Sequence, residues 1–345
     1  MHHDAITGTH EYPTEISYYK TLDKALEFIS KAKELFRGSG EENFKFSEVS
    51  IILNTTEYIS NILVNPSAID RDEVMNITLP QTNENIEYVV ILETAKNNTN
   101  IKGFVTEIDE IDENTKELTK VRKLFFRLKI DKLSTARLYI LMTKDAKNCK
   151  KYGITCSVFI QRELIEKPHQ IGNGKINLDF NDKGSLTKIS QIYNESAYQD
   201  FPIEEKITYY RTDGKSRSGH YIFNPIEKEE VLKTILQKKY HYKLGDLITI
   251  FQVHEDAKNA QILKTYSVNL QGNQQLLEQY AMQIEFFSKD TIEASLSLKL
   301  SEKSGKSFTA YADDSMKLIE RPIYHKNVDI MRHNNVELTG YFTYA

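Results

Sequence analysis

From Thr56 onward the chain is divided into short runs of β-branched and aromatic residues, separated by Asn, Asp, Lys and Gly. Runs of this length between turn-forming residues are typical of strands in antiparallel sheets. The pattern therefore predicts a small antiparallel β-sandwich over residues 56–168. Its expected strands lie within residues 57–66, 72–80, 86–94, 123–130, 136–143 and 154–163.

A boundary is expected near residue 168, where Pro168 and His169 precede the turn Gly172-Asn173-Gly174. Asn-Gly pairs favour tight hairpin turns, because both central positions adopt positive φ. Further strand-like runs predict a second, larger β region over residues 169–345. These runs are 175–180, 185–190, 206–211, 220–225, 247–254, 263–270, 280–287, 292–300 and 316–321. The segment 227–240 fits either a helix or a strand.

Residues 14–37 carry a helical pattern instead, with apolar side chains at steps of three and four residues on one face. Gly38 and Gly40 follow and end the helix, and a second short helix is expected over residues 45–53. The apolar face consists of Tyr18, Leu22, Ala25, Leu26, Ile29, Ala32 and Leu35. The expected fold is therefore mainly β, with an N-terminal helical segment within residues 1–55.

The length of 345 residues suggests two or three domains. The 45 basic and 49 acidic residues give a net charge of −4 with mixed signs, which offers no argument for nucleic-acid binding. No apolar run approaches membrane-spanning length, and the first twenty residues lack the apolar core of a signal peptide. We therefore expect neither a nucleic-acid partner nor a membrane span, and the oligomeric state stays open.

The two cysteines, Cys149 and Cys156, either form one disulfide or remain as two free thiols, and no zinc-binding spacing is present. Four N-x-[S/T] sequons favour the secretory pathway slightly. They begin at Asn54, Asn76, Asn97 and Asn194.

Several residues of chemically active types are interpreted as structural. Two Gly-Lys-Ser triplets, at 214–216 and 305–307, lack the glycine five residues earlier that a phosphate-binding loop requires. Asp313 and Asp314 are expected in a turn, because adjacent residues on a strand point to opposite faces. Five histidines lie among polar residues and are expected at the surface or in turns. They are His169, His241, His254, His325 and His333.

The most specific motif is at residues 2–9, which read HHDAITGT. These eight contiguous residues resemble the HHDA-[IV]-[ST]-GT signature of the family-38 glycoside hydrolases, the retaining class II α-mannosidases of the Golgi and lysosome. Residues 218–225 read SGHYIFNP and resemble the family's SGAYIF-x-P, with His220 in place of Ala. Weaker resemblances occur in the family's order at residues 62–66, 177–189 and 311–321.

In that family a zinc ion binds the vicinal hydroxyls of mannose. Two histidines and two aspartates hold the ion, and one aspartate is also the nucleophile. The resemblance implies that His3 is a zinc ligand and that Asp4 hydrogen-bonds the sugar. It also implies that His2 lines the pocket wall and that Tyr221 reaches the sugar. Retaining hydrolysis needs a carboxylate nucleophile and a carboxylic acid, and neither is assigned among residues 1–345.

The resemblance refines the expected fold to a β-sandwich followed by an incomplete galactose-mutarotase-like super-sandwich. The chain is interpreted as the middle part of a zinc-dependent α-mannosidase, with its catalytic barrel expected upstream of Met1. The implied substrates are terminal α-mannosyl residues of mannose-containing glycans, and the implied compartment is the lysosome or Golgi. The isolated chain is expected to be inactive. Two alternatives remain: a non-catalytic carbohydrate-binding or interaction module, and a degenerate remnant.

Overall fold

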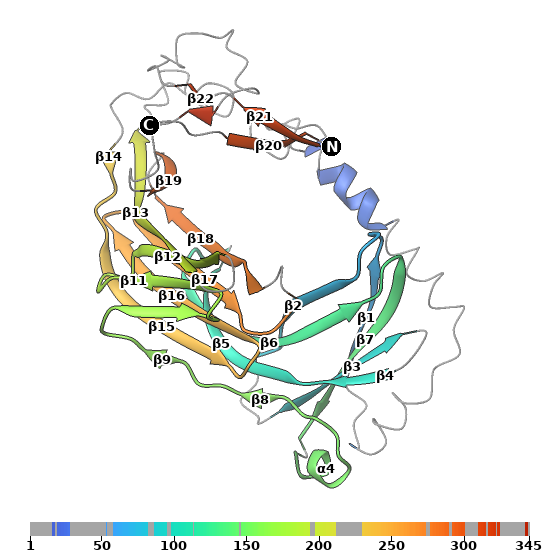
Figure 1. Cartoon of the computed structure of the whole chain (residues 1–345). Coiled ribbons are helices and arrows are strands. Elements are labelled where there is room, and N and C mark those ends of the chain that lie inside the picture. Colours follow the sequence, from blue (N-terminus) through green and yellow to red (C-terminus); the bar gives the residue numbers. More distant parts are fainter. Residues whose placement is uncertain are drawn as a thin grey trace. The chain divides into compact units, whose positions relative to one another are not determined.

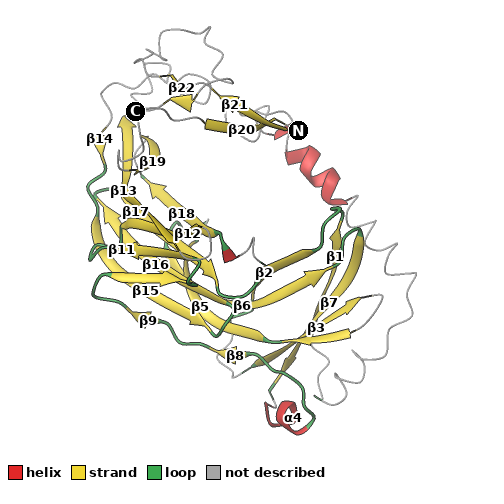
Figure 2. Cartoon of the chain, in the orientation of Figure 1, coloured by secondary structure: helices red, strands yellow, loops and turns green. Residues whose placement is uncertain are grey.

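The chain forms two compact units in the computed structural model. The larger unit comprises Lys20–Asp200 and Lys233–Asp290, and the smaller unit comprises Met1–Tyr19, Phe201–Leu232 and Thr291–Ala345. Strands dominate the described residues (Figure 2). The structure describes residues 16–17, 19–27, 53, 58–81, 86–94, 98–112, 114–144, 146–193, 197–211, 230–273, 277–289, 292–300, 310–314, 317–321, 323–324 and 342–343.

Two four-stranded sheets of the larger unit pack face to face as a β-sandwich (Figure 1). Sheet I has the order β1-β7-β3-β4, and sheet II has the order β2-β6-β5-β8. Neighbouring strands are antiparallel except β5 and β8, which are parallel. The strands are β1 (Tyr58–Asn65), β2 (Arg71–Thr78), β3 (Glu87–Thr94), β4 (Asn98–Ile101), β5 (Gly103–Ile111), β6 (Leu118–Ile130), β7 (Ser134–Thr143) and β8 (Val158–Phe159).

Strand β3 shows why sheet I is buried on both faces. Its sequence EYVVILET is apolar at consecutive positions, and alternate side chains point to opposite faces. Val90 and Leu92 pack into the core between sheets I and II, whereas Val89 and Ile91 pack on the outer face. Helix α4 (Ala146–Lys151) contributes Cys149 to that outer cluster.

Cys149 and Cys156 are joined in a disulfide, with their Cα atoms 6.0 Å apart. Of the two alternatives left open by the sequence, the structure contains the bridge. It closes a short loop over the outer face of sheet I, where Cys149 is buried beside Leu141 and Ile154.

Sheet III has the strand order β18-β17-β16-β15-β9 and packs on the outer face of sheet II. Phe104 and Phe125 of sheet II contact Tyr242, Leu244 and Ile250 of sheet III in one buried cluster. The strands are β9 (Glu163–Leu164), β15 (Ile235–Leu244), β16 (Ile248–Ala257), β17 (Ala260–Asn269) and β18 (Tyr280–Ser288).

The opposite face of sheet III is covered by β10 (His169–Gly172), β11 (Ile176–Phe180) and β12 (Leu186–Tyr193). Phe180 of β11 packs on Phe251 and Tyr266, with ring centroids 4.5 and 4.7 Å away. Because Ile250 and Phe251 are neighbours on β16, they point to opposite faces. The larger unit is therefore a stack of sheets, which explains why eight successive residues of β16 are buried.

The smaller unit contains strands paired over long sequence distances. Strand β13 (Ala197–Arg211), which enters this unit at Phe201, pairs antiparallel with β14 (Glu230–Val231) and β19 (Ile292–Leu300). A hairpin joins β20 (Ala310–Asp314) and β21 (Lys317–Arg321). Short parallel strands β22 (Ile323–Tyr324) and β23 (Phe342–Thr343) complete the described elements.

The predicted fold class, mainly β with an N-terminal helical segment, is confirmed. Described helical residues 16–17 and 19–27 lie inside the predicted helix 14–37. The ambiguous segment 227–240 contributes strand residues, in β14 and at the start of β15. The galactose-mutarotase-like type and the boundaries of the regions 1–55, 56–168 and 169–345 stay predictions. The helix predicted over 45–53, apart from Leu53, and the strand predicted over 220–225 lie outside the described residues.

Three sequence expectations need correction. Strand β5 was not predicted, because its alternating acidic residues break the apolar pattern. Of the run 154–163, only Val158–Phe159 and Glu163 are in strands. Asp313 and Asp314 are strand residues of β20 rather than a turn, and Asp314 pairs with Lys317 across the hairpin.

The turn predicted at Gly172-Asn173-Gly174 is present, but its geometry differs from the expected one. It connects β11 to β10, a strand that was not predicted. Gly174 has a φ of +84°, whereas Asn173 is not among the described residues with positive φ. Instead, Asn173 Oδ1 accepts hydrogen bonds from the backbone N–H groups of Lys175 and Ile176, at 2.8 and 3.0 Å. The asparagine thus stabilises this turn through its side chain.

Candidate functional site

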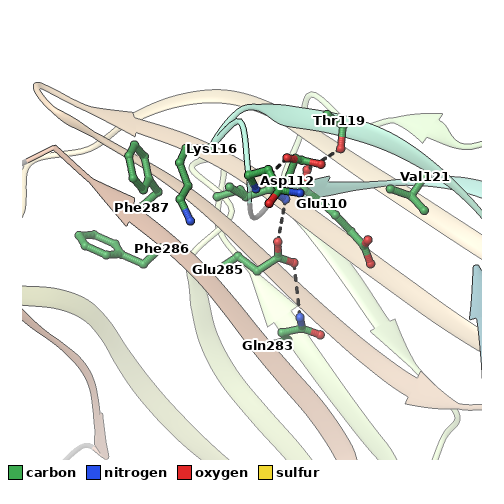
Figure 3. Close-up of a pocket in the computed structure, with 11 residues that line it drawn as sticks. Glu110, Asp112, Lys116, Thr119, Val121, Gln283, Glu285, Phe286 and Phe287 are labelled. Carbon is green, nitrogen blue, oxygen red and sulfur yellow. Dashed lines mark hydrogen bonds between the residues drawn. The ribbon is translucent and has the colours of Figure 1, made fainter. Parts of the chain in front are cut away.

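A groove of about 610 Å³ lies between β18 and the connection from β5 to β6 (Figure 3). All of its lining residues belong to the larger unit. They are Glu110, Ile111, Asp112, Asn114, Lys116, Thr119, Val121, Gln283, Glu285, Phe286 and Phe287. Acidic, amide and aromatic side chains therefore meet in one open site.

One wall of the groove is a row of side chains on β18. Gln283, Glu285 and Phe287 alternate along the strand and so share one face, at a spacing of about 7 Å per pair of residues. Among the described strands, β18 is an edge strand of sheet III and has β17 as its neighbour on one side. The row of side chains on β18 is therefore accessible. The amide, carboxylate and phenyl groups thus lie in sequence order along the groove (Figure 3).

The opposite wall is the turn from Asp112 to Glu117. Asp112 Oδ1 accepts hydrogen bonds from the backbone N–H groups of Asn114 and Thr115, at 2.9 and 2.7 Å. The bonds from Thr115 and then Asn114 lower the pKa of the Asp112 carboxyl. Lys116 has a φ of 59°, in the left-handed region, and its Nζ lies 5.9 Å from the centre of the Phe287 ring. The turn therefore brings an ammonium group over the aromatic end of the row.

Glu285 links the two walls. Its Oε2 accepts a hydrogen bond from the backbone N–H of Ile111 at 2.7 Å, and its Oε1 lies 3.4 Å from Gln283 Nε2. Burial raises the pKa of the Glu285 carboxyl, and the nearby charge of Glu110 acts in the same direction. Glu110 itself forms an ion pair with Lys123.

The groove floor is held by an unusual arrangement along β5. On its edge opposite β6, beyond the short pairing with β8, this strand receives hydrogen bonds from side chains instead of from another strand. Gln252 of β16 accepts from the backbone N–H of Asp109 at 3.1 Å and donates to its carbonyl at 2.9 Å. Glu285 then accepts from Ile111, two residues on. Sheet III therefore fixes the position of β5 through amide and carboxylate groups.

A buried polar cluster extends this seam. The side chain of Asp109 is only 4% exposed and accepts a hydrogen bond from Arg162 Nη1 at 2.7 Å. The Arg162 guanidinium lies 3.8 Å from the centre of the Tyr240 ring, and Tyr242 donates to Gln252 Oε1 at 2.9 Å. Burial of the hydroxyl raises the pKa of Tyr242. Arg162 therefore compensates the buried charge of Asp109.

His254 lies at the end of this cluster and lines a smaller cavity of about 230 Å³. Its Nε2 is buried 3.3 Å from Asp109 Oδ2, but the pair lacks hydrogen-bond geometry. Burial is the main cause of the lowered pKa of His254, which the charge of Asp109 opposes. The imidazole is therefore held mainly neutral.

The arrangement supports recognition of a ligand better than acid–base catalysis. The carboxyls of Asp112 and Glu285 have pKa values displaced in opposite directions, as in many acid–base pairs. However, the shift of Asp112 comes from hydrogen bonds that close its own turn, and Glu285 is bonded to the backbone of β5. Both carboxylates therefore have structural partners and retain lone pairs toward the groove.

The four residues assigned by resemblance, His2, His3, Asp4 and Tyr221, lie outside the described residues. Their proposed roles stay predictions. The two Gly-Lys-Ser triplets, His325 and His333 also lie outside the described residues.

The surface or turn placement expected for three histidines is wrong. His254 is buried, and His169 and His241 are half-buried with ring centroids 4.5 Å apart. Burial lowers the pKa of His241 to about 4, with a further contribution from His169, whose pKa burial also lowers. The strand neighbours of His241 and His254 are buried as well, because sheet III is covered on both faces. That coverage comes from distant parts of the chain and is not visible in the local sequence.

The described residues do not fit a zinc site. In this part of the chain, one group of potential ligands converges, formed by Glu87, Cys149 and Cys156. Because the two sulfur atoms are bonded to each other, neither is a thiolate that could bind the metal. His3, the one zinc ligand implied by the resemblance, lies outside the described residues.

Among the described residues, no helix has the length and apolar character needed to cross a membrane. A scan against models of protein families finds no match, and a search of curated proteins finds no significant relative. The resemblance to the class II α-mannosidases therefore rests on the motifs in the sequence.

Proposed function

We propose that this chain is the β-rich part of a retaining class II α-mannosidase that acts on terminal α-mannosyl residues of glycans. The observation that carries the proposal is the contiguous motif HHDAITGT at residues 2–9. The helical segment and stacked antiparallel sheets that follow agree with the order of regions that the resemblance implies.

In this proposal His3 is a ligand of the catalytic zinc, and Asp4 hydrogen-bonds the mannose hydroxyls. His2 lines the pocket, and Tyr221 reaches the sugar from the β region. When bound, zinc would act as a Lewis acid and position the substrate. The nucleophile and the general acid would come from a catalytic barrel, because the motif assigns neither to residues 1–345.

The test joins this chain to the catalytic barrel of a class II α-mannosidase and measures release of p-nitrophenol from p-nitrophenyl α-mannoside. We expect zinc-dependent activity from the joined protein and none from the isolated chain. Removing a metal ligand should be severe, so His3→Ala should lower kcat/KM by about 100-fold or more.

His325→Ala is a matched control, because it removes a histidine to which no role is assigned. Activity of the isolated chain, or an unchanged kcat/KM in His3→Ala, would contradict the proposal. In the same protein, Tyr221→Phe should lower kcat/KM by about fivefold or more, because one hydrogen bond to the sugar is lost.

A further inference from the structure

The groove of Figure 3 has the chemistry of a site for hydroxyl groups. Carboxylates accept hydrogen bonds at several lone-pair positions, and an amide both donates and accepts. Glu285 uses Oε2 for Ile111, and its Oε1 makes only a long contact with Gln283. Gln283 is exposed, and Lys116 supplies a further donor. A ligand with many hydroxyls could bond to each of these groups.

The aromatic end of the row adds an apolar surface. Phe287 is half-buried and lines the groove, so its ring is fixed by packing and still accessible. The C–H face of a sugar ring packs well on such a surface, because the burial is apolar and costs little side-chain entropy. The polar groups and the phenyl ring on one strand face therefore match the two kinds of surface of a pyranose.

The charges of the lining residues favour a neutral ligand. Glu110 is paired with Lys123, and Asp112 and Glu285 face one lining ammonium, that of Lys116, so a net negative charge disfavours an anionic ligand. A metal ion is not favoured either. Within the described residues, the carboxylates of the groove do not converge as a group of potential metal ligands.

The size of the site favours more than one sugar unit. A volume of about 610 Å³ lies within the roughly 300–1,000 Å³ of ligand sites. A second hollow of about 460 Å³ shares Lys116 and Phe287 with the groove and continues past them toward Asn259 and Gln261. We propose that the groove along Gln283, Glu285 and Phe287 binds a neutral oligosaccharide. This inference rests on the larger unit alone and does not depend on the α-mannosidase assignment.

The test is isothermal titration of the full chain with three trisaccharides: mannotriose, maltotriose and the acidic trigalacturonate. We expect saturable binding of at least one neutral trisaccharide and none of trigalacturonate. Phe287→Ala and Phe287→Leu should each weaken binding about tenfold, because both remove the planar surface while the second keeps apolar volume. Glu285→Gln should weaken binding about threefold or more, because a charged acceptor is replaced by a neutral one. The amide oxygen of Gln can still accept from the backbone N–H of Ile111, so β5 should keep its position.

Matched controls lie outside the groove. Phe159→Ala removes a phenyl ring that is 53% exposed on β8, and Glu163→Gln neutralises an exposed carboxylate on β9. Both should bind as the unsubstituted chain does. Failure of both neutral trisaccharides to bind, or equal binding by both Phe287 variants and the unsubstituted chain, would overturn the proposal. Binding without mannosidase activity in the joined protein would leave this inference standing and contradict only the proposed function.

Discussion

Replacing His241 by Gln should make the folded larger unit less sensitive to acid. His241 Nε2 lies 2.8 Å from Thr249 Oγ1, its ring is 4.5 Å from that of His169, and its side chain is 16% exposed. Burial and the neighbouring His169 lower its pKa from 6.5 to about 4, while Glu163 opposes the shift. Gln can keep a hydrogen bond to Thr249 and cannot take up a proton in this range.

The sign follows from the direction of the shift. Because the folded pKa lies below the unfolded value, the unfolded chain binds more protons between pH 4 and 6.5. The contribution of neutral His241 to stability is therefore complete above pH 6.5 and is lost as the pH falls toward 4. The full shift corresponds to about 2 kcal/mol lost between pH 7.5 and 5. Screening by solvent at the partly exposed ring reduces the expected loss to about 1 kcal/mol.

Urea unfolding at pH 5, 6 and 7.5 measures the effect. Between pH 7.5 and pH 5, the free energy of unfolding should decrease for both proteins. The decrease should be about 1 kcal/mol smaller for His241→Gln than for the unsubstituted chain. Other titrating groups are common to both proteins and cancel in this difference. Glu163→Gln is the comparison variant: it removes a carboxylate that opposes the lowered pKa of His241, so it should not reduce the acid sensitivity. Equal acid sensitivity in His241→Gln and the unsubstituted chain would refute the assignment of a depressed pKa to buried His241.

Two further predictions concern buried polar contacts of sheet III. Lys264 Nζ and Glu255 Oε1 lie 2.6 Å apart with almost no exposure, so Lys264→Met should lower the free energy of unfolding by about 3 kcal/mol. In urea unfolding, the double variant Lys264→Met with Glu255→Leu should recover most of this loss. If the losses of the two single variants simply add, Lys264 and Glu255 are not energetically coupled. Gln252→Leu should cost about 3 kcal/mol, because it leaves groups of Asp109 and Tyr242 without their partner. Gln261→Leu, at an exposed position of β17, should cost little. Equal losses in the two variants would argue against the clamp on β5, meaning the hydrogen bonds from Gln252 and Glu285 to the backbone of Asp109 and Ile111.

The strands could be predicted from the sequence where local pattern determines burial. Runs such as 86–94 and 247–254 are rich in β-branched and aromatic residues, and both form strands buried on two faces. Strand β5 was missed because GFVTEIDEI mixes acidic residues into the pattern. Among those acidic residues, Asp109 pairs with the distant Arg162, and Glu107 and Glu110 pair with Arg122 and Lys123 of the neighbouring strand β6. Their burial depends on tertiary contacts that no local window contains.

The groove could not be predicted for the same reason. The bond between Ile111 and Glu285 joins residues 174 positions apart, and the bonds between Asp109 and Gln252 span 143 positions. The alternation of Gln283, Glu285 and Phe287 is visible in the sequence and predicts a shared face. It does not reveal that the turn at Asp112 lies opposite. The signature HHDAITGT is contiguous and therefore visible in the sequence, whereas the groove is formed by segments that are far apart in the chain.

The clamp on β5, formed by the side chains of Gln252 and Glu285, also explains why the groove beside residues 109–111 is open. Another strand paired with β5 would satisfy its backbone at residues 109–111 and would fill the space beside the turn. Side chains from β16 and β18 satisfy the same N–H and C=O groups at single points and leave the space between them open. Because Glu285 both holds β5 and faces the groove, changes that loosen the clamp should also alter the groove. Gln252→Leu should therefore weaken binding in the groove as well as stability, although Gln252 does not line it.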